Sequence, residues 1–243
     1  MMDTTRIQIA HGGGGVLTAE LLDELILPAL GGPQDPHRLT DAAMLDLSPS
    51  GKIAFTTDTF VVRPLEFPGG DIGKLAVCGT VNDLAVAGAT PRALSLALVL
   101  QEGLELDVLR RVLDSAGTAA LEVGVPIVTG DTKVVGREAC DGILINTAGV
   151  GEVSPDIALG FDRVREGDSV LLSGPLGEHG LSVLSCRESL SLATDLRSDC
   201  TEGGGGDPVM LPTPGRGLPP VRVRAPSLGP ACPEDIRTAE GCA

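Results

Sequence analysis

The sequence FPGGDIGKLAVCGTVNDLAVAGATP, residues 67–91, carries a helix-length run of small apolar residues that leads quickly into an apolar stretch. We expect a helix over residues 71–87 and a strand over residues 93–99, because the first segment has helical length and the second is a short apolar run. A helix joined to a strand by so short a connection is typical of proteins that mix both elements. The segment therefore indicates an α/β fold.

The same alternation extends on both sides of this segment, from about residue 7 to residue 198. Further strands are expected at 53–57, 126–129, 142–150 and 169–173, and further helices at 17–30, 106–123 and 180–188. Residues 201–243 are rich in glycine and proline and lack sustained periodicity. This composition is typical of a disordered tail rather than of a packed domain.

Composition narrows the classes of function. The chain has 243 residues, 42% of them hydrophobic, which is enough for a substantial core. Its net charge of −15 and its 2% aromatic content argue against nucleic-acid binding and against an anionic membrane surface. The chain shows no apolar run long enough to span a bilayer, so we expect a cytoplasmic protein. Six cysteines without C-x-x-C spacing predict neither a zinc site nor a disulfide framework.

The first two candidate binding features are a glycine run near the N-terminus and an aspartate at position 58. His11-Gly-Gly-Gly-Gly precedes a predicted helix, where backbone N–H groups and the helix dipole favour an anion. A flexible N-terminal arm is an equally open interpretation. Asp58, in TTDTFVV, follows an apolar strand and should face a cleft at the strand end, although a turn-forming aspartate is the alternative.

Two further groups of polar residues are candidates for the binding site. Asn82 and Asp83 interrupt an apolar helix, so Asp83 should have a cation or strong donors as partners, or else lie on a solvated face. Asp131, Thr132 and Lys133 follow the predicted strand 126–129, at a glycine hinge. A carboxylate and an ammonium group so placed suit a Mg²⁺-phosphate site, with a surface turn as the alternative. Together these features favour phosphoryl chemistry.

The residues of these motifs closely resemble those of one family. AHGGGG, TTDTFVV, the segment 67–91, TGDTKVV, and GEV followed by GD and LLSGPLGEHG are similar to the hydrogenase maturation factor HypE, a member of the PurM-like ATP-binding superfamily. The resemblance covers nearly all of residues 7–200. It implies a PurM-like N-terminal domain whose mixed sheet pairs into a dimeric barrel, followed by an incomplete second α/β domain.

The resemblance implies boundaries and a reaction. The expected segments are a glycine-rich arm and helix (1–36), the ATP-binding domain (37–152), the start of a second domain (153–200) and the tail (201–243). HypE accepts a carbamoyl group on its C-terminal cysteine from HypF, and uses ATP to dehydrate the thiocarboxamide to a thiocyanate. The cyanide then passes to iron in the HypC–HypD complex. The expected protein is thus a homodimer that uses ATP and Mg²⁺.

Site residues follow from the matching motifs. The metal ligands implied are Asp58, Asp83 and Asp131, and Lys133 would assist activation of the amide oxygen. The nucleotide-binding residues implied are His11, Gly12, Gly13, Gly14, Gly15, Asp58, Asn82 and Thr132. The arm from His11 to Gly15 would close over the nucleotide.

The chain departs from the family pattern after Ser198-Asp-Cys. HypE continues into a second domain and ends in a cysteine, whereas this sequence ends Glu-Gly-Cys242-Ala, so Cys242 is not assigned the acceptor role. We expect a truncation or a frameshift after about residue 200. The alternatives to an active dehydratase are a non-catalytic relic that only dimerises, and another PurM-like kinase such as thiamine-monophosphate kinase.

Overall fold

A four-stranded mixed sheet forms the centre of the computed structural model, which describes residues 5–31, 45, 52–157, 159, 165–168, 176–187 and 197–198. Its strands are β1 (Lys52–Phe60), β4 (Ala89–Gln101), β5 (Ile127–Val135) and β6 (Ile143–Val153). They lie in the order β1-β6-β4-β5. Strand β6 is antiparallel to both β1 and β4, whereas β4 and β5 are parallel. Parallel neighbours require a crossover connection, and helix α4 (Leu106–Glu122) supplies it.

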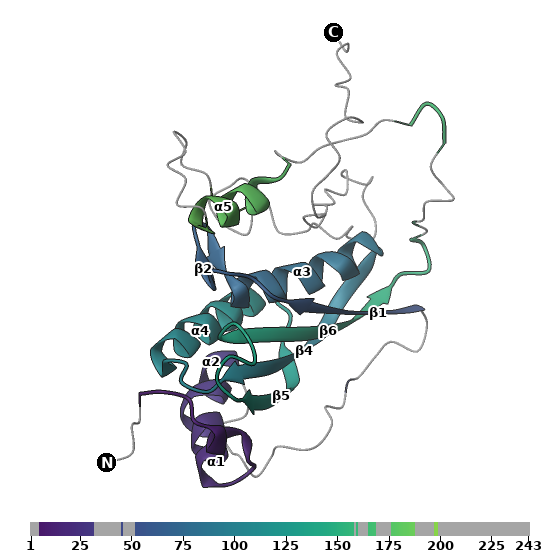
Figure 1. Ribbon diagram of the computed structural model, residues 1–243. Coiled ribbons are helices and arrows are strands. Elements are labelled where there is room, and N and C mark those ends of the chain that lie inside the picture. The colour runs from purple at the N-terminus through teal and green to yellow at the C-terminus, as the bar shows by residue number, and fades with distance from the viewer. Residues whose placement is uncertain are drawn as a thin grey trace.

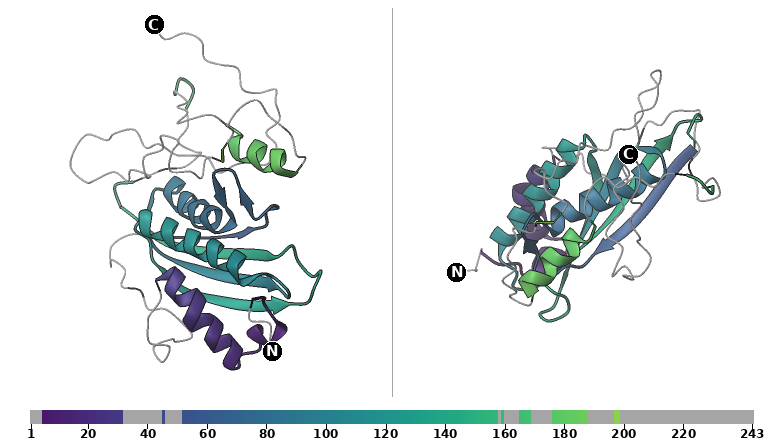
Figure 2. Two further views of the ribbon diagram at one scale, coloured as in Figure 1. Left: turned by 90° about the vertical axis from the view of Figure 1, so that its left-hand side faces the viewer. Right: turned by 90° about the horizontal axis from the view of Figure 1, so that it is seen from above.

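The helices gather on one face of this sheet (Figures 1 and 2). Helix α3 (Ile72–Val86) packs beside α4 and contacts β1, β6 and β4. An N-terminal helical run is formed by α1 (Val16–Leu21), the π-helical turn η2 (Leu22–Ile26) and α2 (Leu27–Leu30), and it packs on α4. The left view of Figure 2 shows the purple, teal and blue helices in front of the strands.

Helix α3 begins where the sequence supplies a cap. A two-stranded hairpin of β2 (Glu66–Phe67) and β3 (Gly70–Asp71) leads directly into the helix. The Asp71 carboxylate accepts hydrogen bonds from the N–H groups of Gly73 and Lys74, at 2.7 and 3.1 Å. These bonds satisfy two of the free donors of the first turn. Helix α5 (Glu178–Arg187) packs near the same hairpin, and its Ser182 hydroxyl donates to the carbonyl of Pro68.

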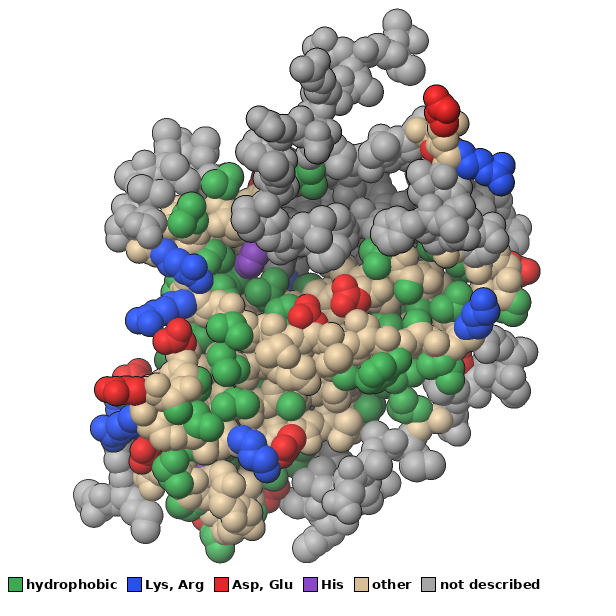
Figure 3. All heavy atoms as spheres, turned by 45° about the vertical axis from the view of Figure 1, so that its right-hand side comes forward, with side chains coloured by type: hydrophobic (Ala, Val, Ile, Leu, Met, Phe, Trp, Pro, Cys, Tyr) green, Lys and Arg blue, Asp and Glu red, His purple; other side chains and the backbone are tan. Residues whose placement is uncertain are grey.

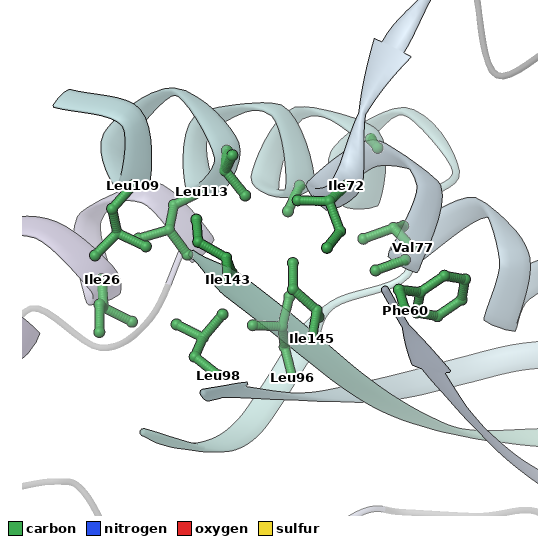
Figure 4. Close-up of a cluster of buried hydrophobic side chains, with 14 of the residues drawn as sticks. Ile26, Phe60, Ile72, Val77, Leu96, Leu98, Leu109, Leu113, Ile143 and Ile145 are labelled. Carbon is green, nitrogen blue, oxygen red and sulfur yellow. The ribbon is translucent and has the colours of Figure 1, made fainter. Parts of the chain in front are cut away.

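The core lies between the sheet and the helices (Figure 4). Alternate residues of β4 point into it, so that Leu96 and Leu98 are no more than 3% exposed. They meet Ile143 and Ile145 of β6 and, from the helices, the side chains of Ile72, Val77, Leu109 and Leu113. Each such side chain contributes about 1.5–3 kcal/mol when fully buried. Aliphatic burial therefore holds the layers together, as the low aromatic content requires.

The opposite face of the sheet has no helix over it among the described residues. Its large apolar side chains include Ile53 and Phe55 on β1, which are 60% and 68% exposed. Figure 3 is turned toward this side and shows hydrophobic and uncharged side chains across its middle, with few acidic or basic ones among them. We call this surface the open face. The sheet is open in the single chain, so the dimeric barrel stays a prediction.

The α/β prediction is confirmed, and most elements lie where the sequence placed them. The helices predicted at 71–87 and 106–123 are α3 and α4, and the strand predicted at 142–150 is β6. All four strands of the sheet are longer than predicted: β1 continues to Phe60, β4 spans Ala89–Gln101, β5 continues to Val135 and β6 continues to Val153. The strand predicted at 169–173 and the tail 201–243 lie outside the described residues. The four predicted segments and the boundaries between them stay predictions.

Candidate active site

Two of the predicted carboxylates lie together where β1 faces helix α3. The Thr56 hydroxyl donates a hydrogen bond to Oδ2 of Asp83 at 3.0 Å, which links the strand to the helix. Asp58 is two residues further along β1 and therefore points to the same side as Thr56. Its Oδ2 lies on the α3 side, since a Cβ built at Gly79 would be 3.9 Å from that oxygen. We call Thr56, Asp58 and Asp83 the β1–α3 cluster.

The β1–α3 cluster is partly open to solvent. Asp58 is exposed, whereas Thr56 and Asp83 are half-buried. Oδ1 of Asp58 accepts a hydrogen bond from the N–H of Thr59 at 2.7 Å, which orients its carboxylate. Asn82 is half-buried next to Asp83. Two carboxylates and a hydroxyl provide the oxygen ligands that Mg²⁺ prefers, so the chemistry of these groups fits such an ion.

The third predicted carboxylate, Asp131, lies elsewhere on the sheet. Strand β5 is separated from β1 by β6 and β4, which corresponds to about 14 Å of sheet width. Thr132 is the register partner of the buried Leu98, so Asp131 and Lys133 point to the open face. A single chain therefore does not bring Asp131 to the β1–α3 cluster. Among the described residues, no three His, Cys, Asp or Glu side chains are close enough to hold a metal ion.

Asp131 and Lys133 are neighbours on the open face. Lys133 Nζ is 3.6 Å from Asp131 Oδ1, and both side chains are more than 60% exposed. The same oxygen accepts the N–H of Thr132 at 2.8 Å. The prediction that these residues follow a strand end is wrong, because β5 continues through them to Val135. Asp58 likewise lies within β1 rather than after it.

The glycine run divides into a packed half and an open half. His11 is 9% exposed and its Nδ1 accepts the N–H of Gln8 at 2.8 Å, within the 3-10 helix η1 (Ile9–Gly12). Gly12 packs on β5, since a Cβ there would be 2.8 Å from the nitrogen of Val134. Gly13, Gly14 and Gly15 have no such contact under 3.4 Å. The run therefore lies beside the strand that carries Asp131 and Lys133, and its closure over a nucleotide stays a prediction.

Sequence reasoning missed the hydroxyl and amide groups that support the β1–α3 cluster. The amide nitrogen of Asn146 donates to the carbonyl of Asp58 at 2.9 Å and to two hydroxyls of β1. The hydroxyls of Thr80 and Thr147 are in direct contact and both residues are fully buried. The signal was available, because Asn146 and Thr147 interrupt an otherwise apolar strand.

Asp71, in the segment 67–91, has a structural role rather than a place in the β1–α3 cluster. Burial raises its pKa, an effect that hydrogen bonds from Ser115 and from the N–H groups of Lys74 and Gly73 oppose. Its Oδ1 accepts both of these N–H groups as the cap of α3. Glu66 nearby pairs with Arg111 of α4 at 2.7 Å, and this hydrogen bond lowers the pKa of the Glu66 carboxyl. Both carboxylates thus have structural roles in joining the elements around α3.

Known proteins share both the motifs and the fold of this chain. The family described as AIR synthase related protein, N-terminal domain, matches residues 39–153. Carbamoyl dehydratase HypE from Rhodobacter capsulatus is 50% identical over 201 residues, which is 82% of this chain and 58% of the relative. Over most of its length the chain is similar to HypE. It spans under three fifths of the length of that relative.

Solved HypE structures superpose on the described fold. A crystal structure of the hydrogenase maturation protein HypE in complex with ATP gives a TM-score of 0.74 at 50% identity, covering 79% of this chain and 57% of that one. A HypE–HypF complex gives a TM-score of 0.60 at 42% identity, covering 76% and 58%. The PurM-like N-terminal fold is therefore confirmed. Within the described part of this chain, no helix has the length and apolar character of a bilayer span.

Proposed function

We propose that this HypE-like chain contributes to the ATP-dependent dehydration of a protein-bound S-carbamoyl cysteine. The observation that carries the proposal is the 50% identity with a carbamoyl dehydratase over 201 residues, which is 82% of this chain. The reaction forms a bond between the amide oxygen and the γ-phosphorus of ATP, and ADP leaves. Loss of phosphate and of both amide protons then converts the thiocarboxamide to a thiocyanate, the source of cyanide for [NiFe]-hydrogenase iron.

The β1–α3 cluster is the proposed site for magnesium. Asp58 and Asp83 would hold the ion, and Thr56 already orients Asp83 through its hydrogen bond. Asn82 lies beside this cluster and would contact the nucleotide. When bound, Mg²⁺ supplies positive charge that stabilises the transferring phosphoryl group. A hydrogen-bonded carboxylate half-buried between a strand and a helix keeps its orientation, which suits a site that must present ATP in one pose.

Completion of the site requires a second copy of the chain. Asp131, Thr132, Lys133 and the His11–Gly15 run lie at the other edge of the sheet, and Asp131 and Lys133 point to the open face. The exposed Ile53 and Phe55 on this face favour burial against another apolar surface. We propose a homodimer that covers the open face, so that Asp131 and Lys133 of one copy approach the β1–α3 cluster of the other. Lys133 would then neutralise charge on the phosphoryl group.

Two partners follow from this proposal. A HypF-type carbamoyltransferase would supply the carbamoyl group, and the structural similarity to HypE in a HypE–HypF complex supports it. A HypC–HypD-type iron complex would receive the cyanide. Both would act on the cysteine that carries the substrate, which is not assigned to a described residue.

The test is nucleotide binding and turnover by the protein with Mg²⁺, HypF and carbamoyl phosphate. Wild-type protein should bind ATP more tightly with Mg²⁺ than with a chelator, and Asp83→Asn should lose that difference. Asp114→Asn is the matched control, because Asp114 is exposed on α4, away from the β1–α3 cluster. If the wild-type protein bound no Mg-ATP and released no phosphate, the proposed function would be abandoned.

A further inference from the structure

Helix α3 lies very close to β1 and β6 at the β1–α3 cluster. A Cβ at Gly149 of β6 would be 2.9 Å from Cγ2 of Thr80 and 2.9 Å from Cδ1 of Leu84. A Cβ at Gly79 of α3 would be 2.7 Å from the ring of Phe60. Such distances are far below normal carbon–carbon contacts of about 3.5–4.0 Å. An added methyl group would collide on both sides of this contact unless these side chains moved, so the two glycines let the helix lie close to the sheet.

A pair of buried hydroxyls lies at the same contact. Thr80 of α3 and Thr147 of β6 are both 0% exposed, and their hydroxyls form a hydrogen bond. Thr147 also donates to the carbonyl of Ala76 at 3.5 Å. In the described part of the chain, the Thr80–Thr147 pair forms the only fully buried hydrogen bond between two side chains that joins α3 to the sheet. It stands among apolar residues, where a polar pair adds specificity of position rather than net stability.

This pair is placed to control the two carboxylates. Thr147 is the register partner of Asp58 on β1, and Thr80 lies one helical turn before Asp83. Two hydroxyl oxygens approach to about 2.7–2.8 Å, whereas two methyl carbons stop at about 3.5–4.0 Å. Replacing both hydroxyls by methyl groups would push α3 about 1 Å from the sheet. Asp83 would move with the helix while Asp58 stayed with the strand.

We propose that Thr80 and Thr147 are positioning residues that set the separation between Asp58 and Asp83. The proposal rests on the proposed function, because it assigns the two carboxylates to a Mg-ATP site. Thr80 and Thr147 do not touch the ligand; they act through the distance between α3 and β1. The double variant Thr80→Val/Thr147→Val keeps the outline of both side chains and leaves no buried hydroxyl without a partner, so it should fold, with a loss of stability limited to the overpacking at this contact.

The experiment separates position from stability with two kinds of variant. Urea unfolding and ATP titration calorimetry, with Mg²⁺ and with a chelator, are measured for each protein. In the double valine variant the gain in ATP affinity due to Mg²⁺ should fall roughly ten- to hundred-fold, because a displacement near 1 Å has effects of this size. Thr147→Ser keeps the hydroxyl and loses a buried methyl group, so it should be less stable and keep the wild-type Mg²⁺ dependence.

Each outcome decides one question. A double valine variant that is folded and has an unchanged Mg²⁺ dependence overturns the positioning role while leaving the proposed function standing. A serine variant that is folded but has lost the Mg²⁺ dependence overturns it as well, even if the double variant cannot be purified. A wild-type protein without any Mg²⁺-dependent ATP binding removes the proposed function first, and the positioning role with it.

Discussion

Replacing Gly130 by alanine tests whether the glycine of the Gly-Asp-Thr-Lys motif is needed for strand pairing. A Cβ at this position would be 2.1 Å from the carbonyl oxygen of Leu96 on β4. Carbon–oxygen contacts normally begin near 3.3 Å, so the two strands would have to separate locally by about 1 Å. The obstructing atom belongs to the backbone, and no side-chain rotation can relieve it. Strand β5 would therefore shift as a whole, together with Asp131.

The expected loss is at the upper end of the range for overpacking, about 3 kcal/mol. Gly136→Ala is the matched control, because Gly136 directly follows the same strand and has no atom within 4 Å of its Cβ position; its free energy of unfolding should change by less than about 0.5 kcal/mol. Urea unfolding monitored by circular dichroism measures both, with the midpoint compared at an unchanged slope. Equal midpoints for the two variants would refute the reasoning that Gly130 is structurally required.

Three further changes probe other parts of the chain. Glu138 has a φ of 68°, so Glu138→Gly should raise the free energy of unfolding by about 0.5–1 kcal/mol, and a lower urea midpoint would contradict this. The hydrogen bond from Arg111 lowers the pKa of Glu66 from its ordinary 4.5, so its contribution is present above about pH 4.5 and is lost on acidification; the urea midpoint of Glu66→Gln should therefore fall less than that of the wild type between about pH 7 and pH 4. Cys186 is exposed, whereas Cys140 is half-buried and burial raises the pKa of its thiol. A short iodoacetamide pulse followed by peptide mapping should therefore label Cys186 before Cys140. Equal labelling of the two would contradict this difference in reactivity.

Local sequence rules located the helices well because their signals are local. Helix α3 was expected over 71–87 and spans Ile72–Val86, since Asp71 caps its first turn and Gly88 adopts a φ of 74° just after it. The strand limits were less accurate. Polar residues inside β1 and β5 suggested strand ends, although hydrogen bonding to neighbouring strands continues through Asp58 and Asp131.

The relative placement of the three aspartates could not be derived from local patterns. Asp58 and Asp131 were expected just after strand ends, where ligands of α/β proteins bind, and Asp83 within a helix. The side to which a strand residue points depends on register with a neighbour far away in the sequence. Asp58 pairs with Thr147 and faces α3, whereas Asp131 pairs with Ala97 and faces away from the helices. The short motifs that contain the aspartates do not predict either pairing.

Under the proposed homodimer, assembly and site completion are one physical event. The apolar residues that need a covering surface, Ile53 and Phe55, share the open face with Asp131 and Lys133. Covering this face removes water from around Lys133 and Asp131. The attraction between Lys133 and any phosphate brought there is then stronger. In the separate chain both groups remain more than 60% exposed, where such an interaction contributes little. Burial of the apolar strands thus provides the driving force that places the charged groups of β5 at a nucleotide.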